Sequence, residues 1–122
     1  MKFARLGPAG EELPVVVLED EVRSLAGLTD DIDGAFWASD GPARAAAALA
    51  AGDLPLVEGA DTLRVGAPIT QPGAIVCIGM NYAAHAAESG SEPPSVPVIF
   101  FKAPNTIAGP NDTVTIPRNS TK

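Results

Sequence analysis

A histidine and a glutamate stand three positions apart in an alanine-rich stretch of this chain. His85 and Glu88 end the run Gly-Met-Asn-Tyr-Ala-Ala-His-Ala-Ala-Glu, residues 79–88. In a helix this spacing puts both side chains on one face, where the carboxylate can hydrogen-bond the imidazole, raise its basicity and fix its tautomer. Such a pair can serve as a general base that takes a proton from water.

Other interpretations of the pair remain open at this point. A His and a Glu at this spacing also occur as an ordinary pair on a helix surface. His85, Glu88 and Glu92 together are a conceivable metal site, although they lack a second histidine and match no standard zinc spacing. The chain has no G-x-G-x-x-G, P-loop or G-x-S-x-G motif, so nucleotide-binding and serine-hydrolase functions have no support.

Short apolar runs bounded by Pro and Gly predict the strands around this motif. Gly73–Gly79 leads into a short helix that we expect Asn81 to cap, and further strands are predicted at 96–102 and 113–116. The polar residues 117–122 provide nothing to pack against these strands. We therefore expect the rest of the sheet to come from more of this chain, another chain or a partner.

The first half of the chain predicts a small module of its own. An alanine-rich helix is expected at 43–51, with Pro42 in its first turn, Asp40 near the capping position and Gly52 at its end. Strands are predicted at 2–6, 14–18, 22–25 and 62–65, with a turn at 19–21. The predicted fold class is α+β, mainly β, with a module at 1–65 and a second unit at 66–122.

Composition limits the classes of partner. The chain carries 8 Lys and Arg against 15 Asp and Glu, a net charge of -7, and it has no basic cluster to bind nucleic acid. No apolar run has the length of a signal peptide or a membrane span. The single cysteine, Cys77, has apolar neighbours and is expected to be a buried strand residue. These features predict a cytoplasmic protein.

The stretch Ile75–Glu88 resembles the hallmark of the fumarylacetoacetate hydrolase family: an apolar strand, then Gly-x-Asn-Tyr, two residues, His, two residues and Glu. Pro97–Pro104 is similar to the Pro-x-x-Phe-x-Lys-x-Pro segment of the family, and 109–112 and 116–117 resemble its next turn and strand. The resemblance is continuous over roughly residues 73–122. Residues 1–65 resemble the variable N-terminal module of longer bacterial members.

The resemblance implies a mixed β-roll, a homodimer and a small anionic oxo-acid substrate. The complete enzyme would be a metal-dependent hydrolase that cleaves a carbon-carbon bond in a diketo acid or an acylpyruvate-like substrate. By the same resemblance His85 and Glu88 are catalytic, and the substrate-binding residues are Asn81, Tyr82 and Lys102. Met80 stands where some acylpyruvate-cleaving members have arginine, so the resemblance does not by itself assign their substrate preference to this chain.

The family binds Mg²⁺ or Mn²⁺ through acidic residues that begin with a Glu-x-Glu pair, and these would lie beyond residue 122. We expect no metal ligands within this chain, and we expect the 122 residues alone to be inactive. Two alternatives stay open. One is an isomerase or decarboxylase acting on a 2-oxo or 2-hydroxydienoate diacid, and the other is a non-catalytic fragment or interaction module.

Overall fold

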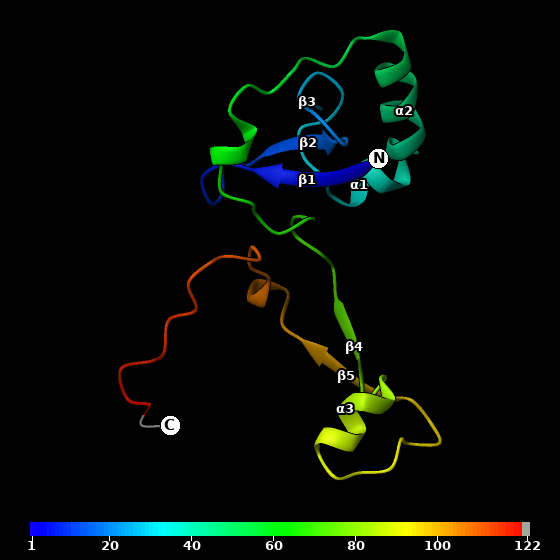
Figure 1. Cartoon of the computed structure of the whole chain (residues 1–122), viewed down its shortest axis with the longest axis vertical. Helices are drawn as coiled ribbons and strands as arrows, with labels where there is room; N and C mark the ends of the chain where they lie inside the picture. The colour runs from blue at the N-terminus through cyan, green and yellow to red at the C-terminus, as the bar shows by residue number, and fades with distance from the viewer. Residues whose placement is uncertain (121–122) are drawn as a thin grey trace. The chain divides into compact units, whose positions relative to one another are not determined.

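The computed structural model describes residues 1–120, which fall into two compact units (Figure 1). Among the described residues, the first unit holds Met1–Thr70 together with residues 107–120, and the second holds Gln71–Thr106. The second unit is therefore an excursion of the chain that leaves the first unit and returns to it. The predicted division at residue 65 stays a prediction.

The first unit contains a three-stranded antiparallel sheet in the order β1-β2-β3. The strands are β1 (Lys2–Leu6), β2 (Leu13–Val17) and β3 (Val22–Ser24). The predicted turn at 19–21, with the sequence Glu-Asp-Glu, joins β2 to β3, and the Leu18 N–H donates to the Glu21 carbonyl at 2.9 Å. All three strands lie where the short apolar runs predict them.

Two helices pack in the first unit, α1 (Gly34–Ala38) and α2 (Gly41–Ala51). Gly52 ends α2 in the left-handed conformation at φ 77°, as predicted, because glycine adopts this conformation without a steric cost. Asp40 is at the capping position of α2, as predicted, with φ 55°, but its side chain makes no capping hydrogen bond. Helix α1 was not predicted; Asp33 caps it by accepting from the Phe36 N–H at 2.9 Å.

The hydrophobic core of the first unit lies between the sheet and α2. Its buried members are Val16, Leu25, Ala45 and Leu54. An aromatic cluster adjoins it, in which Phe36 is buried and makes edge-to-face contacts with Phe3 and Trp37 at centroid distances of 5.4 and 5.2 Å. Burial of these side chains supplies most of the stabilising free energy of such a small module.

The second unit is one antiparallel hairpin with a helix in its connection. Strand β4 (Ile75–Gly79) pairs with β5 (Val98–Lys102), and α3 (Ala83–Glu88) lies between them in the sequence. Cys77 lies in β4 as predicted, but it is half-buried and not fully buried. Every residue of β5 is exposed within this structure, including four large apolar side chains: Val98, Ile99, Phe100 and Phe101.

Two predicted strands are wrong. Residues 113–116 form no strand, and Val114 and Ile116 are 84% and 72% exposed, because no neighbouring strand is present among residues 1–120 to pair with them. Residues 62–65 contribute only a single bridge from Val65 to Leu6, after the short 3₁₀ helix Ala60–Thr62. A second 3₁₀ turn covers Pro104–Thr106.

The α+β class is confirmed by these two antiparallel sheets and three α-helices in the part of the chain that the structure describes. None of the helices within residues 1–120 is long and apolar enough to cross a membrane.

Candidate active site

Strand β4 is followed by a turn and then by α3, which carries His85 and Glu88. Met80 follows the strand at φ 50°, a left-handed conformation that a residue with a Cβ rarely adopts. This residue turns the backbone sharply between β4 and α3. Strained residues of this kind often mark a functional site, so the conformation of Met80 fits the placement of the motif.

His85 and Glu88 are brought together on α3. The His85 Nδ1 atom lies 3.6 Å from Glu88 Oε2, one helical turn along the same face. The two side chains are 67% and 78% exposed, so as a simple surface ion pair they would add little stability. The separation is just beyond hydrogen-bonding range, and a small side-chain rotation would close it.

Asn81 does not cap α3, contrary to the sequence prediction. The helix begins one residue later, with Tyr82 at the capping position and its carbonyl accepting from the N–H groups of His85 and Ala86 at 3.0 and 3.2 Å. The left-handed turn at Met80 reverses the chain before Asn81 can reach the first helical N–H groups. Tyr82 itself is 75% exposed.

Asn81 instead lines an open pocket of about 290 Å³ between the end of β4 and the proline-rich connection to β5. The residues around the pocket are Ile78, Gly79, Met80, Asn81, Pro93, Pro94, Ser95, Val96 and Pro97. The walls are mostly apolar or backbone, which suits a small ligand held by a few polar groups. His85 and Glu88 do not line this pocket.

Lys102 lies at the other end of the hairpin from the motif. It pairs with Ile75, whereas the turn to α3 follows Gly79, which pairs with Val98. Four residues of strand separate these two positions, about 13 Å at 3.3 Å per residue. The hairpin therefore gathers Asn81, Tyr82 and the His85–Glu88 pair at one end and holds Lys102 at the other.

The described residues form no metal-binding cluster. No group of three or more His, Cys, Asp or Glu side chains in residues 1–120 is close enough to hold one. The conceivable set of His85, Glu88 and Glu92 is not such a group in the structure. The residues present therefore do not fit a divalent ion by themselves.

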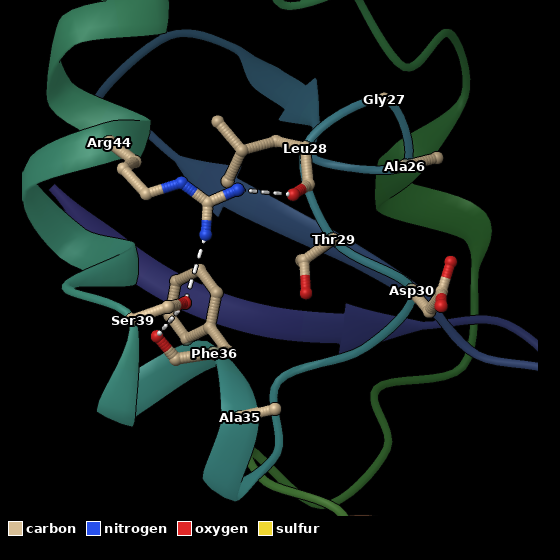
Figure 2. Close-up of a pocket in the computed structure, with 9 residues that line it drawn as sticks. All are labelled: Ala26, Gly27, Leu28, Thr29, Asp30, Ala35, Phe36, Ser39 and Arg44. Carbon is tan, nitrogen blue, oxygen red and sulfur yellow. Dashed lines mark hydrogen bonds between the residues drawn. The ribbon is translucent and has the colours of Figure 1, made fainter.

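A second pocket, of about 380 Å³, lies in the first unit beside α1 and α2 (Figure 2). Arg44 reaches across it and donates to Ser39 Oγ at 2.9 Å and to the Leu28 carbonyl at 2.8 Å. These bonds fasten the loop after β3 to the start of α2. The sequence did not indicate this contact, because Arg44 looks like any solvated helix residue.

The sequence also did not indicate a row of ion pairs in the first unit. Arg5 and Glu12 are nearly buried and contact each other at 3.1 Å, with further charged neighbours on either side. Their partners are distant in the sequence, so no local pattern could have shown them.

Comparison with known proteins finds similarity in both halves of the chain. Residues 74–122 match the family model described as fumarylacetoacetate (FAA) hydrolase C-terminal. The resemblance of the motif segment to the fumarylacetoacetate hydrolase family is thereby confirmed, over the residues that contain β4, α3 and β5.

Curated relatives extend the similarity to the first unit. Proteins of Burkholderia lata and Burkholderia multivorans, each named "putative hydrolase", are 41% and 42% identical over 123 residues, covering 100% of this chain and 43% of each relative. A Sphingomonas protein named 2,4-didehydro-3-deoxy-L-rhamnonate hydrolase is 40% identical over 122 residues, covering 99% of this chain and 40% of the relative. The chain thus spans about two fifths of the length of these relatives.

Proposed function

We propose that this sequence is part of a metal-dependent hydrolase that cleaves a carbon-carbon bond in a diketo acid or an acylpyruvate-like substrate. The family match over residues 74–122 supports the reaction class. The name of the Sphingomonas relative describes a sugar acid oxidised at carbons 2 and 4 and without a hydroxyl at carbon 3. Such a compound is a 2,4-diketo acid, the substrate class proposed here. A small anionic oxo acid would be the natural ligand.

The observation that carries the proposal is the 3.6 Å separation of His85 Nδ1 and Glu88 Oε2. When the Nδ1–H donates to the carboxylate, the lone pair of the imidazole is left on Nε2, which can accept a proton from water. The resulting hydroxide would add to the substrate carbonyl. The carbon-carbon bond would then break with its electron pair leaving as an enolate, which would take up the proton held on Nε2 to form the ketone product. A positioned base of this kind contributes about 10²- to 10⁴-fold to the rate.

A divalent ion, Mg²⁺ or Mn²⁺, belongs to the proposal through family resemblance, with its ligands outside the described residues. Oxygen ligands would suit either ion. Asn81 and Tyr82 are proposed substrate contacts at the same end of the hairpin as the pair, and Lys102 is proposed as a further contact.

The exposed hairpin supports two further parts of the proposal. Apolar side chains of β4 and β5 are exposed, among them Val76, Ile78 and Phe101, and such a two-stranded sheet is marginal unless more strands or another chain covers it. A mixed β-roll built onto this hairpin, and a homodimer, are therefore proposed. A cytoplasmic location stays a prediction.

The test uses a chimaera in which this chain replaces the matching residues of the Sphingomonas hydrolase. The chimaera and the 122-residue chain alone are assayed for product on 2,4-diketo acids, acylpyruvates, oxaloacetate and hydroxymuconate-type diacids. We expect hydrolysis of a diketo acid by the chimaera and none by the chain alone.

Other products would identify the alternatives. Isomerised or decarboxylated product would favour an isomerase or decarboxylase that uses the same enolate chemistry. A folded chimaera that converts no substrate with Mg²⁺ or Mn²⁺ present would contradict the enzyme proposal and favour a non-catalytic module.

A further inference from the structure

Five charged side chains in the first unit form a continuous row of alternating sign, here called the ionic row. In order along the row these are Asp31, Arg5, Glu12, Arg64 and Asp112. Arg5 and Glu12 at its centre have side-chain exposures of 7% and 6%. Buried charges are tolerated only when paired, so the row is a constraint on how its segments pack and not an incidental surface contact.

Arg64 makes the last link of the row with the geometry of a fork. Its Nε donates to Asp112 Oδ1 and its Nη2 to Asp112 Oδ2, both at 2.6 Å. Its Nη1 donates to Glu12 Oε1 at 2.9 Å and to the Gly7 carbonyl at 3.2 Å. Such bidentate, charge-assisted bonds fix orientation as well as distance. The segment that carries Asp112 is therefore held in one position against the segment that carries Arg64.

Backbone contacts hold the same two segments together. Gly109 is buried, and a Cβ at this position would overlap the carbonyl oxygen of Val65. The Gly109 N–H also donates to Asp112 Oδ2 at 2.7 Å, so Asp112 shapes its own turn as well as binding Arg64. The contact between 64–65 and 109–112 thus rests on two independent kinds of packing.

Arg64 and Asp112 lie on either side of the second unit in the sequence. They are 48 residues apart, and the whole second unit, Gln71–Thr106, lies between them in the sequence. Bringing the two ends of such a long segment together lowers the conformational entropy of the chain. If no contact joined these ends, only the two-stranded hairpin of β4 and β5 would offset this loss. A hairpin of that size is marginal in water.

We propose that Arg64 and Asp112 form a clamp within the first unit, which holds together the segments before and after the second unit in the sequence, and that they are positioning residues for the segment carrying His85 and Glu88. The ordering of β4 and β5 then depends on an ion pair made within the first unit. The consequence for catalysis rests on the proposed function, but the coupling itself does not.

Amide hydrogen exchange on the isotope-labelled 122-residue chain tests the clamp without any assay of activity. Asp112→Asn, Arg64→Gln and the double variant are compared with the unmodified chain. We expect amides of β4 and β5 to exchange about tenfold faster in each single variant. Arg64→Gln also removes the bonds to Glu12 Oε1 and the Gly7 carbonyl. Adding Asp112→Asn to Arg64→Gln should change exchange in β4 and β5 little further, because the pair with Asp112 is already lost. Protection of β1 and β2 should persist.

Glu21→Gln is the matched control. It breaks the equally bidentate pair between Glu21 and Arg23, with distances of 2.7 and 2.9 Å, but these residues are only two apart and enclose no excursion. Exchange in β4 and β5 should not change in this variant. Unchanged exchange there in Asp112→Asn, with β1 and β2 intact, would overturn the clamp.

A salt titration covers the case in which the variants unfold the first unit. Added salt weakens partly exposed ion pairs, and Arg64 and Asp112 are 31% and 24% exposed. In the unmodified chain, protection of β4 and β5 should fall with salt while that of β1 and β2 holds. Salt-independent protection of β4 and β5 would overturn the proposal, whether or not the protein proves to be a hydrolase.

Discussion

His85 Nδ1 lies 3.6 Å from Glu88 Oε2 across one turn of α3, and both side chains are open to solvent. The helix needs no other group to bring them together, because the (i, i+3) spacing alone places them on one face. What the described residues do not supply is a cover that would exclude water from the pair. The helix thus places the two side chains near each other before any other part of a site is added.

Removing the carboxylate should leave the base in place but without orientation. In the chimaera, Glu88→Gln keeps the size of the side chain and loses the charge, and we expect kcat to fall about 10- to 100-fold, as for loss of a group that orients a catalytic histidine. Glu92→Gln is the matched control, since it removes a nearby carboxylate that does not pair with His85. Equal effects of the two substitutions would contradict a specific role for Glu88.

Truncation of Phe36 should destabilise the first unit. This side chain is 1% exposed and contacts Phe3 and Trp37, so Phe36→Ala removes aromatic contacts and leaves a cavity. We expect the free energy of unfolding to fall by about 3 kcal/mol, measured by urea denaturation followed by circular dichroism.

Phe101→Ala provides the comparison. Phe101 is 71% exposed in the second unit, and its truncation should change the free energy of unfolding by less than about 0.5 kcal/mol. Similar losses for the two variants in the 122-residue chain would contradict the exposure of Phe101 in the single chain, and would mean that a second copy already covers the hairpin, as in the proposed homodimer.

Acid should weaken the first unit through the ionic row. Burial acts to raise the pKa of Glu12, but hydrogen bonds from Arg64 and from backbone N–H groups, together with the charge of Arg5, outweigh it and lower this pKa. The bond from Arg64, followed by that from the Gly109 N–H, lowers the pKa of Asp112. In both cases the unfolded chain binds protons more readily than the folded chain.

The stabilising effect of these carboxylates is therefore present above the pKa values of the unfolded chain and is lost as pH falls through the lower folded values. The urea midpoint should stay level from neutral pH to about pH 5 and then drop below about pH 4. Glu12→Gln should lower the midpoint at neutral pH and flatten the acid dependence. Glu11→Gln, at the exposed neighbour, should do neither; a flattened profile in that variant instead would contradict the assignment.

Alanine should have opposite effects on stability at two glycines, because only one of them, Gly52 at the end of α2, has a left-handed backbone. Gly52→Ala forces a Cβ into φ 77° and should cost about 1 kcal/mol of unfolding free energy. Gly27 has an ordinary φ and open space where the methyl group of an alanine would lie, so Gly27→Ala should be neutral or stabilising. Thermal unfolding measures both, and a loss at Gly27 as large as that at Gly52 would contradict the backbone explanation.

Sequence patterns predicted those elements whose signals are local. Apolar runs bounded by turn residues indicate β1, β2 and β3, and the alanine run with Pro42 and Gly52 indicates α2. Helix α1 escaped notice because it has five residues, begins with glycine, and depends on burial of Phe36, which is a tertiary effect. Residues 113–116 have strand-like composition but no partner strand within residues 1–120, so composition alone misled.

The motif allowed His85 and Glu88 to be placed together, because one helical turn relates them. It failed at Asn81, since the left-handed conformation of Met80 belongs to no preference of methionine and shifts the start of α3 by one residue. The clamp between Arg64 and Asp112 was beyond prediction for another reason: its partners are 48 residues apart, and only the folded chain brings them into contact.

The most direct test of the account is kcat/KM of the chimaera with His85→Gln, on whichever diketo acid the unmodified chimaera cleaves. Gln keeps a polar side chain of similar reach but cannot take a proton from water. We predict a fall of about 10²- to 10⁴-fold with the protein still folded by circular dichroism. Turnover at the unmodified rate would contradict the role of His85 as the base and, with it, the mechanism proposed for this site.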